Sequence, residues 1–401
     1  AFVHKLGKRL SHAVGERFLG LPGTSSVAVQ DGRPTPPKDM VLAKTLSLEK
    51  RKIETQILHF DGRDWQGYTY AWDDEQKDAA LVGPGGAEKT IAGRTWTFAA
   101  RSACAGCHAV SWPRFLASFN DAQIVRTDLD RFRALGLIKG PPIAGGPGES
   151  QRLSDPRDAS ADLDARARSY LHVNCAVCHR PGGGTSSMLD LRRDRPLQET
   201  FSLGVRPSLG TFGIADPSIL AAGDPSRSIL FYRMAKMGHG RMPHVGSSIV
   251  DEEGLALIGR WIETLGPAKD PGTPEAADIG RILASTDGAL ALMRAVDGGR
   301  LPPETRSAAV RQGVGHSDDA VRGLFERFRA ATGIAVALLR YGPGAYRDGL
   351  VFGRPRSEIG WGVQTTQYLF LLLPFLRPRR LLLFGNEREC ADRLRDGSVF
   401  A

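Results

Sequence analysis

Two short cysteine motifs are the part of the sequence whose residue types and spacing suggest chemistry most directly. Residues 104–108 read Cys-Ala-Gly-Cys-His, and residues 175–179 read Cys-Ala-Val-Cys-His. Two thiols at this spacing can form thioether bonds with the two vinyl groups of one porphyrin, and the adjacent imidazole can ligate its iron. The pattern therefore predicts two covalently attached c-type haems. The predicted attachment residues are Cys104, Cys107, Cys175 and Cys178, and the predicted iron ligands are His108 and His179.

Zinc binding and thiol redox chemistry are the two other uses of a Cys-x-x-Cys pair. A compact zinc ribbon separates its two pairs by about 15–20 residues, whereas the pairs that begin at Cys104 and Cys175 are much farther apart. Neither zinc nor a redox dithiol explains why a histidine directly follows the second cysteine in both copies. The sequence therefore favours haem over both alternatives.

The second axial ligand determines what a haem can do. A methionine opposite the histidine gives an electron carrier with a raised potential, whereas an open position binds small ligands. Met242 is followed by Pro243 in segment 238–244, between two predicted helices. We therefore expect Met242 to be the second iron ligand at the haem of His179. His239 and His244 are its rivals, whereas Met234 and Met237 lie inside a predicted helix and are more typical of a core.

The haem predicted at His108 has no such partner that the sequence singles out. Each candidate is more typical of a core or surface residue than of a ligand, and an open distal position is the alternative. The candidates are Met40, His59, His172 and Met188, together with His239 or His244.

The elements that must position these residues divide into a β-rich region and a helical region. Runs rich in β-branched and aromatic residues predict strands at 41–48, 52–60, 65–72 and 94–98. The Asp61-Gly62 pair predicts a hairpin between the second and third runs. The aromatic side chains of this region are more typical of sheet packing than of a sugar-binding platform. They are Trp65, Tyr68, Tyr70, Trp72 and Trp96.

Apolar residues at helical spacing predict helices on both sides of the second motif. The predicted helices cover residues 111–139, 162–179, 224–237 and 251–265, with two or three more within 274–331. Asp224-Pro225 predicts the start of the third of these helices, because Asp caps a helix and Pro suits its first position.

The composition of the chain bears on whether the protein has disulfides, binds nucleic acid or spans a membrane. The 401-residue chain has five cysteines, so Cys390 has no disulfide partner outside the motifs. The net charge of +9 is scattered, and the basic block at 377–380 is too short to indicate nucleic acid. No segment reaches the about 20 apolar residues of a membrane span. Covalent haem attachment takes place outside the cytoplasm, so we expect a periplasmic or otherwise exported protein whose signal peptide is absent from this chain.

Residues 165–265 resemble a class I cytochrome c domain in the helix with the second motif, the Met242-Pro243 loop and a final helix with Trp261. Residues 41–330 resemble the dihaem module of large exported bacterial proteins, which is often joined to a propeller like those of quinoprotein sugar dehydrogenases. The segments that carry this resemblance are 44–49, 64–70, 170–175, 222–225 and 240–244.

The resemblance implies an α+β fold, in which a β-rich N-terminal segment precedes a mostly α-helical class I cytochrome c domain and a helical C-terminal extension. The expected boundaries are 1–40, 41–150, 151–268, 269–331 and 332–401, the last of these unassigned. The favoured function is electron transfer by two haems from a dehydrogenase to another cytochrome or an oxidase. A dihaem peroxidase-like enzyme with one five-coordinate haem and a haem-bearing carbohydrate-binding module are the alternatives.

Overall fold

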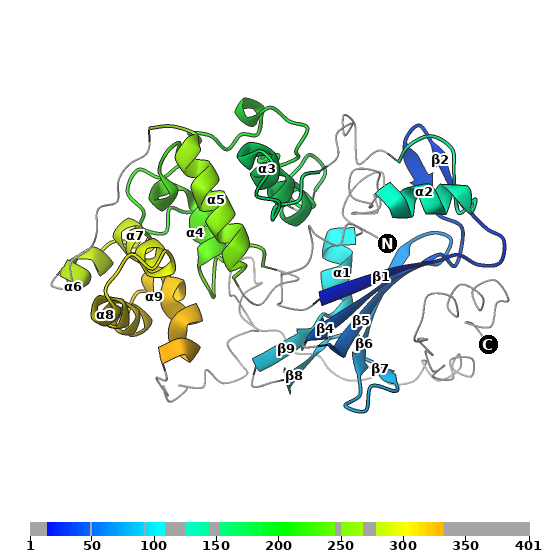
Figure 1. Ribbon diagram of the computed structural model, residues 1–401, viewed down its shortest axis with the longest axis horizontal. Helices are drawn as coiled ribbons and strands as arrows, with labels where there is room; N and C mark the ends of the chain where they lie inside the picture. Colours follow the sequence, from blue (N-terminus) through cyan, green and yellow to red (C-terminus); the bar gives the residue numbers. More distant parts are fainter. Residues whose placement is uncertain are drawn as a thin grey trace, which may run out of the picture. The chain divides into compact units, whose positions relative to one another are not determined.

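The computed structural model combines strands and helices, which confirms the α+β class (Figure 1). It describes residues 14–48, 50–91, 94–108, 126–143, 153–183, 185, 187–244, 250–267 and 278–332. The chain divides into two units, residues 1–332 with 381–401 and residues 333–380, and every described residue lies in the first. Cys390 and the segment after residue 332 lie outside the described residues.

The largest sheet has five antiparallel strands in the order β1-β4-β5-β6-β7. The predicted strands 41–48 and 65–72 are confirmed, and the predicted strand 52–60 is observed one residue longer. The strands are β1 (Val14–Gly20), β4 (Val41–Leu48), β5 (Arg51–Phe60), β6 (Trp65–Trp72) and β7 (Ala79–Leu81). Because β1 pairs with β4, this sheet begins well before residue 41.

The predicted hairpin joins β5 to β6, with Phe60 opposite Trp65. The Asp61 carboxylate accepts hydrogen bonds from the backbone N–H groups of Arg63, at 2.8 Å, and Asp64, at 2.7 Å. Gly62 has a φ of +98°, which an L side chain rarely adopts. The Asp-Gly pair therefore makes this turn through the side-chain hydrogen bonds of Asp61 and the positive φ of Gly62.

Two smaller sheets accompany the five-stranded one, and two of their strands lie between its β1 and β4 in the sequence. The first joins β2 (Val27–Gln30), β3 (Arg33–Thr35) and β10 (Ile138–Lys139), and the second joins β8 (Ala87–Ile91) to β9 (Arg94–Phe98). The strand predicted at 94–98 is thus confirmed, whereas β1, β2, β3, β7, β8 and β10 were not predicted. Several of these are short, and β8 is largely exposed, so they lack the apolar run by which a strand is identified.

The helix predicted over 111–139 is wrong at its C-terminal end. Helix α2 (Arg126–Ala134) is followed by strand β10, and residues 109–125 lie outside the described residues. Gly136, with a φ of +68°, donates to the Arg133 carbonyl, and Leu137 donates to the Phe132 carbonyl, both at 2.9 Å. This is a Schellman motif, in which a left-handed glycine ends a helix.

The helical region has one apolar core that extends from Ala167 to Phe325, with Trp261 and Tyr232 among its largest fully buried side chains. The predicted helix 251–265 is confirmed as α5, and four helices rather than two or three are described after residue 278. The helices are α3 (Leu163–Asn174), α4 (Ile229–Ala235), α5 (Glu252–Thr264), α6 (Ile279–Leu283), α7 (Thr286–Asp297), α8 (Pro303–Val314) and α9 (Asp319–Phe325).

The helix predicted at 224–237 is interrupted. Asp224 caps a single 3₁₀ turn, Pro225–Arg227, by accepting from the Ser226 N–H at 3.1 Å. Ser228 is then extended, and its hydroxyl bonds the Ala221 N–H and the Asp224 carbonyl, both at 2.9 Å. Such side-chain bonds compete with the helical ladder, so α4 begins only after Ser228.

Across the described residues, no helix combines the length and the apolar character needed to cross a bilayer.

Candidate functional site

The second cysteine motif forms a tight turn rather than the end of a helix. Helix α3 ends at Asn174, five residues before the predicted end at His179, because the Ala176 N–H bonds the Leu171 carbonyl, at 3.0 Å, and thereby leaves the helical register. The N–H groups of Cys178 and His179 both bond the Cys175 carbonyl, at 3.1 and 2.9 Å. One turn therefore holds both thiols and the imidazole.

The chain after the motif folds back onto this turn. A Cβ atom on Gly183 would lie 2.1 Å from the Cys178 carbonyl oxygen, so only glycine permits the approach. Farther along, the Leu191 N–H bonds the His179 carbonyl at 2.9 Å. These contacts fix the backbone of the motif from its C-terminal side.

The two cysteines of this motif are half-buried and form no disulfide. Burial, reinforced by the neighbouring Cys178, raises the pKa of Cys175 to about 12. A redox-active cysteine requires the opposite shift, because the thiolate is the reactive form. A thioether carries no charge, so a sulfur in this environment is compatible with haem attachment and poorly suited to thiol exchange.

His179 is half-buried, and its Nδ1 atom has no hydrogen-bond partner among the described residues. Burial lowers its pKa, and the charges of Arg233 and His244 lower it further. The imidazole is therefore neutral near pH 7, the form that binds a metal. A buried ring nitrogen without a partner costs about 1–3 kcal/mol, which suits a side chain whose partner is a bound group.

Segment 238–244, which carries Met242, lies beside this turn. The Met242 N–H bonds the Arg233 carbonyl at 2.9 Å, and the Arg233 guanidinium bonds the Gly240 carbonyl at 3.1 Å. Arg233 and His244 are close enough to His179 to lower its pKa. These electrostatic effects place part of segment 238–244 near the turn of the second motif, although the two are far apart in the sequence.

The candidate ligands in this region differ in burial. Met242 is half-buried, whereas His239 and His244 are exposed. Met234 is buried in the apolar core and Met237 packs against it, as expected of core methionines. Met242 is therefore the methionine of this region that stands apart from the core.

Phe212 was not predicted to belong to the site, yet its ring supports segment 238–244. A Cβ atom on Gly240 would lie 2.8 Å from that ring, which also packs against Tyr232 with 5.0 Å between centroids. The Arg233 guanidinium lies 4.6 Å from the Phe212 centroid. No local pattern marks Phe212 for this role, because its contacts come from residues more than 15 positions away.

Helices α3 and α5 cross closely beside the motif. A Cβ atom on Gly254 would lie 2.4 Å from the Tyr170 ring, and the Tyr170 hydroxyl donates to Asp251 at 3.1 Å. The Trp261 indole donates to Asp164 at 2.8 Å. These contacts fix α3, from which the motif projects, against the helix that follows segment 238–244.

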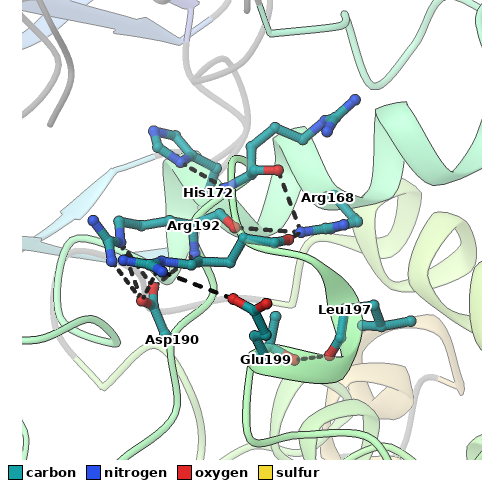
Figure 2. A network of polar contacts seen from close by, with 9 residues as sticks. Arg168, His172, Asp190, Arg192, Leu197 and Glu199 are labelled. Carbon is teal, nitrogen blue, oxygen red and sulfur yellow. Dashed lines mark hydrogen bonds and ion pairs between the residues drawn. The ribbon is translucent and has the colours of Figure 1, made fainter. Parts of the chain in front are cut away.

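His172, a candidate ligand for the first haem, belongs to a buried polar network (Figure 2). Its Nδ1 accepts from the Arg193 N–H at 3.2 Å. Arg192 donates to both carboxylate oxygens of Asp190, the shortest bond being 2.6 Å, and Arg168 donates to the Arg192 carbonyl at 3.4 Å. The network ties the chain after the motif to α3 and gives His172 a structural role.

The titration of His172 should appear in the stability of the protein. Burial and the neighbouring arginines lower its pKa from 6.5 to about 4. The unfolded chain then binds more protons than the folded chain between these values, so stability should fall as the pH drops from about 6.5 to 4, by on the order of 3 kcal/mol. Denaturant unfolding at several pH values measures this, and His172→Asn, which retains an acceptor for Arg193, should lose the dependence. An equal pH slope in both proteins would contradict the assignment.

The first motif lies on helix α1 (Arg101–His108), which packs on β6. A Cβ atom on Gly67 would lie 2.5 Å from Cys104 Cβ, so glycine makes room for the cysteine. Cys104 is half-buried, and burial together with Glu54 raises its pKa. Cys107 and His108 lie on the backbone of α1, and their side chains fall outside the described part of the chain.

Glu54 is an unexpected charged residue under this motif. Only 1% of it is exposed, and it accepts hydrogen bonds from the Trp96 indole and the Gln56 amide, both at 2.9 Å. Trp72 is also buried and donates to Thr55 at 2.9 Å. Trp72 thus packs within the five-stranded sheet and Trp96 of β9 bonds to it, which agrees with the sheet-packing role that the sequence predicted.

The other candidate ligands for the first haem are placed as follows. Met40 is buried in the core beside the five-stranded sheet, and His59 Nε2 forms a 3.0 Å hydrogen bond with Asp39. Because alternate residues of a strand face opposite sides, His59 points away from the face of Gly67, the partner of Leu58. Met188 is 76% exposed.

Comparison with known proteins leaves the site to be interpreted from its own geometry. No protein-family model matches the chain, and no curated protein or solved structure matches it. Within the described ranges, no group of three or more His, Cys, Asp and Glu side chains is arranged to hold a metal ion. A haem iron takes only one or two ligands from the protein.

Proposed function

We propose that this chain is an electron-transfer protein with two covalently bound c-type haems. The observation that carries the proposal is the juxtaposition of the Cys175–His179 turn with segment 238–244. The turn offers the thiols of Cys175 and Cys178 and a neutral imidazole, and segment 238–244 carries Met242. A thioether opposite an imidazole is the ligand pair of an electron-carrying haem.

In this proposal Cys175 and Cys178 hold the second haem and His179 ligates its iron, while Cys104, Cys107 and His108 do the same for the first. Each haem would supply a one-electron redox centre. The residues of the second site fit the group, because the Nδ1 of His179 has no partner among the described residues and the raised pKa of Cys175 keeps its sulfur uncharged. The crossing of α3 and α5 supports a class I cytochrome c domain around it.

Electrons would come from a dehydrogenase and pass to another cytochrome or an oxidase, in the periplasm or another exported location. The net charge of +9 favours acidic partner surfaces, because complementary charge accelerates encounter.

His244 is the second candidate for the distal ligand of this haem, because it lies near enough to His179 to affect its pKa. Two imidazoles would give a centre of lower potential than imidazole and thioether.

A dihaem peroxidase is the second candidate function. Of the candidate ligands for the first haem, Met40 is buried in a core and His59 and His172 are hydrogen-bonded elsewhere, which leaves Met188, His239, His244 or an open position on that iron. An open position binds small ligands. A high-spin band in the oxidised spectrum would favour the peroxidase, and an all-low-spin spectrum would favour electron transfer.

Covalent attachment provides the direct test of the proposal. After expression with cytochrome c maturation machinery, the intact mass should exceed that of the polypeptide by two haems, and acid-acetone should extract neither. The variant with Cys175→Ser and Cys178→Ser should retain one haem, because its first motif is intact. A wild-type mass without haem, or a zinc-loaded chain, would refute the proposal.

A further inference from the structure

Helix α9 is attached to the residues that lead directly into segment 238–244. The Met237 N–H donates to the Gly323 carbonyl at 2.7 Å, and the Tyr232 hydroxyl donates to the Ala320 carbonyl at 3.0 Å. The two bonds join Tyr232 of α4, and Met237 just after that helix, to a helix more than 80 residues later. The position of α9 therefore determines where the chain leaves α4.

The approach at this point is close enough to require glycine. A Cβ atom on Gly323 would lie 2.7 Å from the Met237 carbonyl oxygen and 3.0 Å from Lys236 Cε. The next two residues of α9, Leu324 and Phe325, are fully buried in the apolar core and fix the helix there. Since α9 cannot easily move away, a side chain at position 323 would have to displace the backbone at Met237.

Segment 238–244 would follow such a displacement, because it continues directly from Met237 and is bonded back to Arg233 of α4. It starts at Gly238, with a φ of +74°, directly after Met237. It returns at Met242, whose N–H bonds the Arg233 carbonyl at 2.9 Å. A shift of the Met237 backbone would therefore change the conformation of residues 238–241 and, with it, the position of Met242.

We propose that α9 sets the position of Met242, with Gly323 as a positioning residue that acts through Met237. This inference rests on the proposed haem function and adds to it. The helical C-terminal extension then takes part in the redox site although it carries no haem ligand.

The test compares Gly323→Ala with Gly280→Ala, both of which place a methyl group on the helical extension. A Cβ atom on the exposed Gly280 meets its nearest neighbour, Gln312 Oε1, at 3.9 Å, so this variant should resemble the wild type. Hydrogen exchange at the amides of Met237 and Met242 gives a readout that does not depend on haem chemistry. The near-infrared band of Met-ligated ferric haem and the potential of that haem give the second readout.

In Gly323→Ala, the amides of Met237 and Met242 should exchange at least tenfold faster than in the wild type. The near-infrared band should be weaker and the potential of the Met-ligated haem lower, with two haems still attached. Unchanged exchange at Met242 and an unchanged band in a folded Gly323→Ala protein would overturn the inference.

If Gly323→Ala does not fold, Tyr232→Phe takes its place, since it removes only the bond to Ala320. It should accelerate exchange at Met237, and unchanged exchange there would equally overturn the inference. A wild-type protein without the band would instead refute Met242 as ligand, and the exchange data would still decide the role of α9.

Discussion

Met242→Ala is expected to abolish the near-infrared charge-transfer band of Met-ligated ferric haem and to leave one high-spin or water-ligated haem. The thioether favours ferrous iron, so its loss should also lower the potential of that haem. Axial ligands set haem potentials over about 0.8 V, so the shift should be a substantial part of that range. Pro243 restricts the backbone of Met242, which lowers the entropic cost of holding sulfur on iron. Near-infrared absorption and a spectroelectrochemical titration measure both effects.

Met234→Ala is the matched control, because Met234 lies in the core on α4, the helix that precedes the same segment. It should cost about 2–5 kcal/mol of stability, as truncation of a core methionine does, and leave the band in place. A band that survives Met242→Ala, or that disappears with Met234→Ala, would rule out the assignment. A wild-type protein without the band would make His244 or His239 the better candidate.

Asp190→Ala should lower the free energy of unfolding by about 3–5 kcal/mol, because it leaves the charge of Arg192 buried without its carboxylate. The side chains of Asp190 and Arg192 are 7% and 9% exposed, and their closest contact is 2.6 Å. Burial alone would raise the pKa of Asp190, but the hydrogen bonds from Arg192 hold it below its usual 3.8. The contribution of the pair should therefore be complete above about pH 3.8 and be lost below it.

An exposed pair provides the comparison for Asp190→Ala. Arg157 and Glu253 lie 2.8 Å apart with side chains 35% and 51% exposed. Glu253→Ala should cost less than about 1 kcal/mol, since exposed ion pairs contribute little. Urea unfolding measures the loss of unfolding free energy in both variants. Equal losses would show that the buried pair contributes no more to stability than the exposed pair.

The strands around the hairpin could be predicted because their preferences are local. Residues 41–48 and 65–72 are rich in β-branched and aromatic side chains, and Asp61-Gly62 marks the turn between β5 and β6. The predicted helices were wrong where specific hydrogen bonds override the apolar helical pattern. The hydroxyl of Ser228 divides a predicted helix, and the bond from Ala176 to Leu171 ends α3 before the motif.

The residues of the candidate site likewise fall into those that the local sequence marks and those that it does not. Cys175, Cys178 and His179 are recognisable from spacing, and Met242 from the proline that follows it. Phe212 and Gly323 act through contacts with residues distant in sequence, which no local pattern encodes.

The single apolar core that spans Ala167 to Phe325 has a consequence for the order of assembly. A chain delivered from its N-terminus presents Cys175 and Cys178 about 150 residues before Phe325 arrives to complete that core. Contacts between residues so far apart in sequence form late, because a long loop must first be closed. If the protein takes up haem as proposed, attachment at Cys175 and Cys178 should therefore precede completion of this core, against which Cys175 packs.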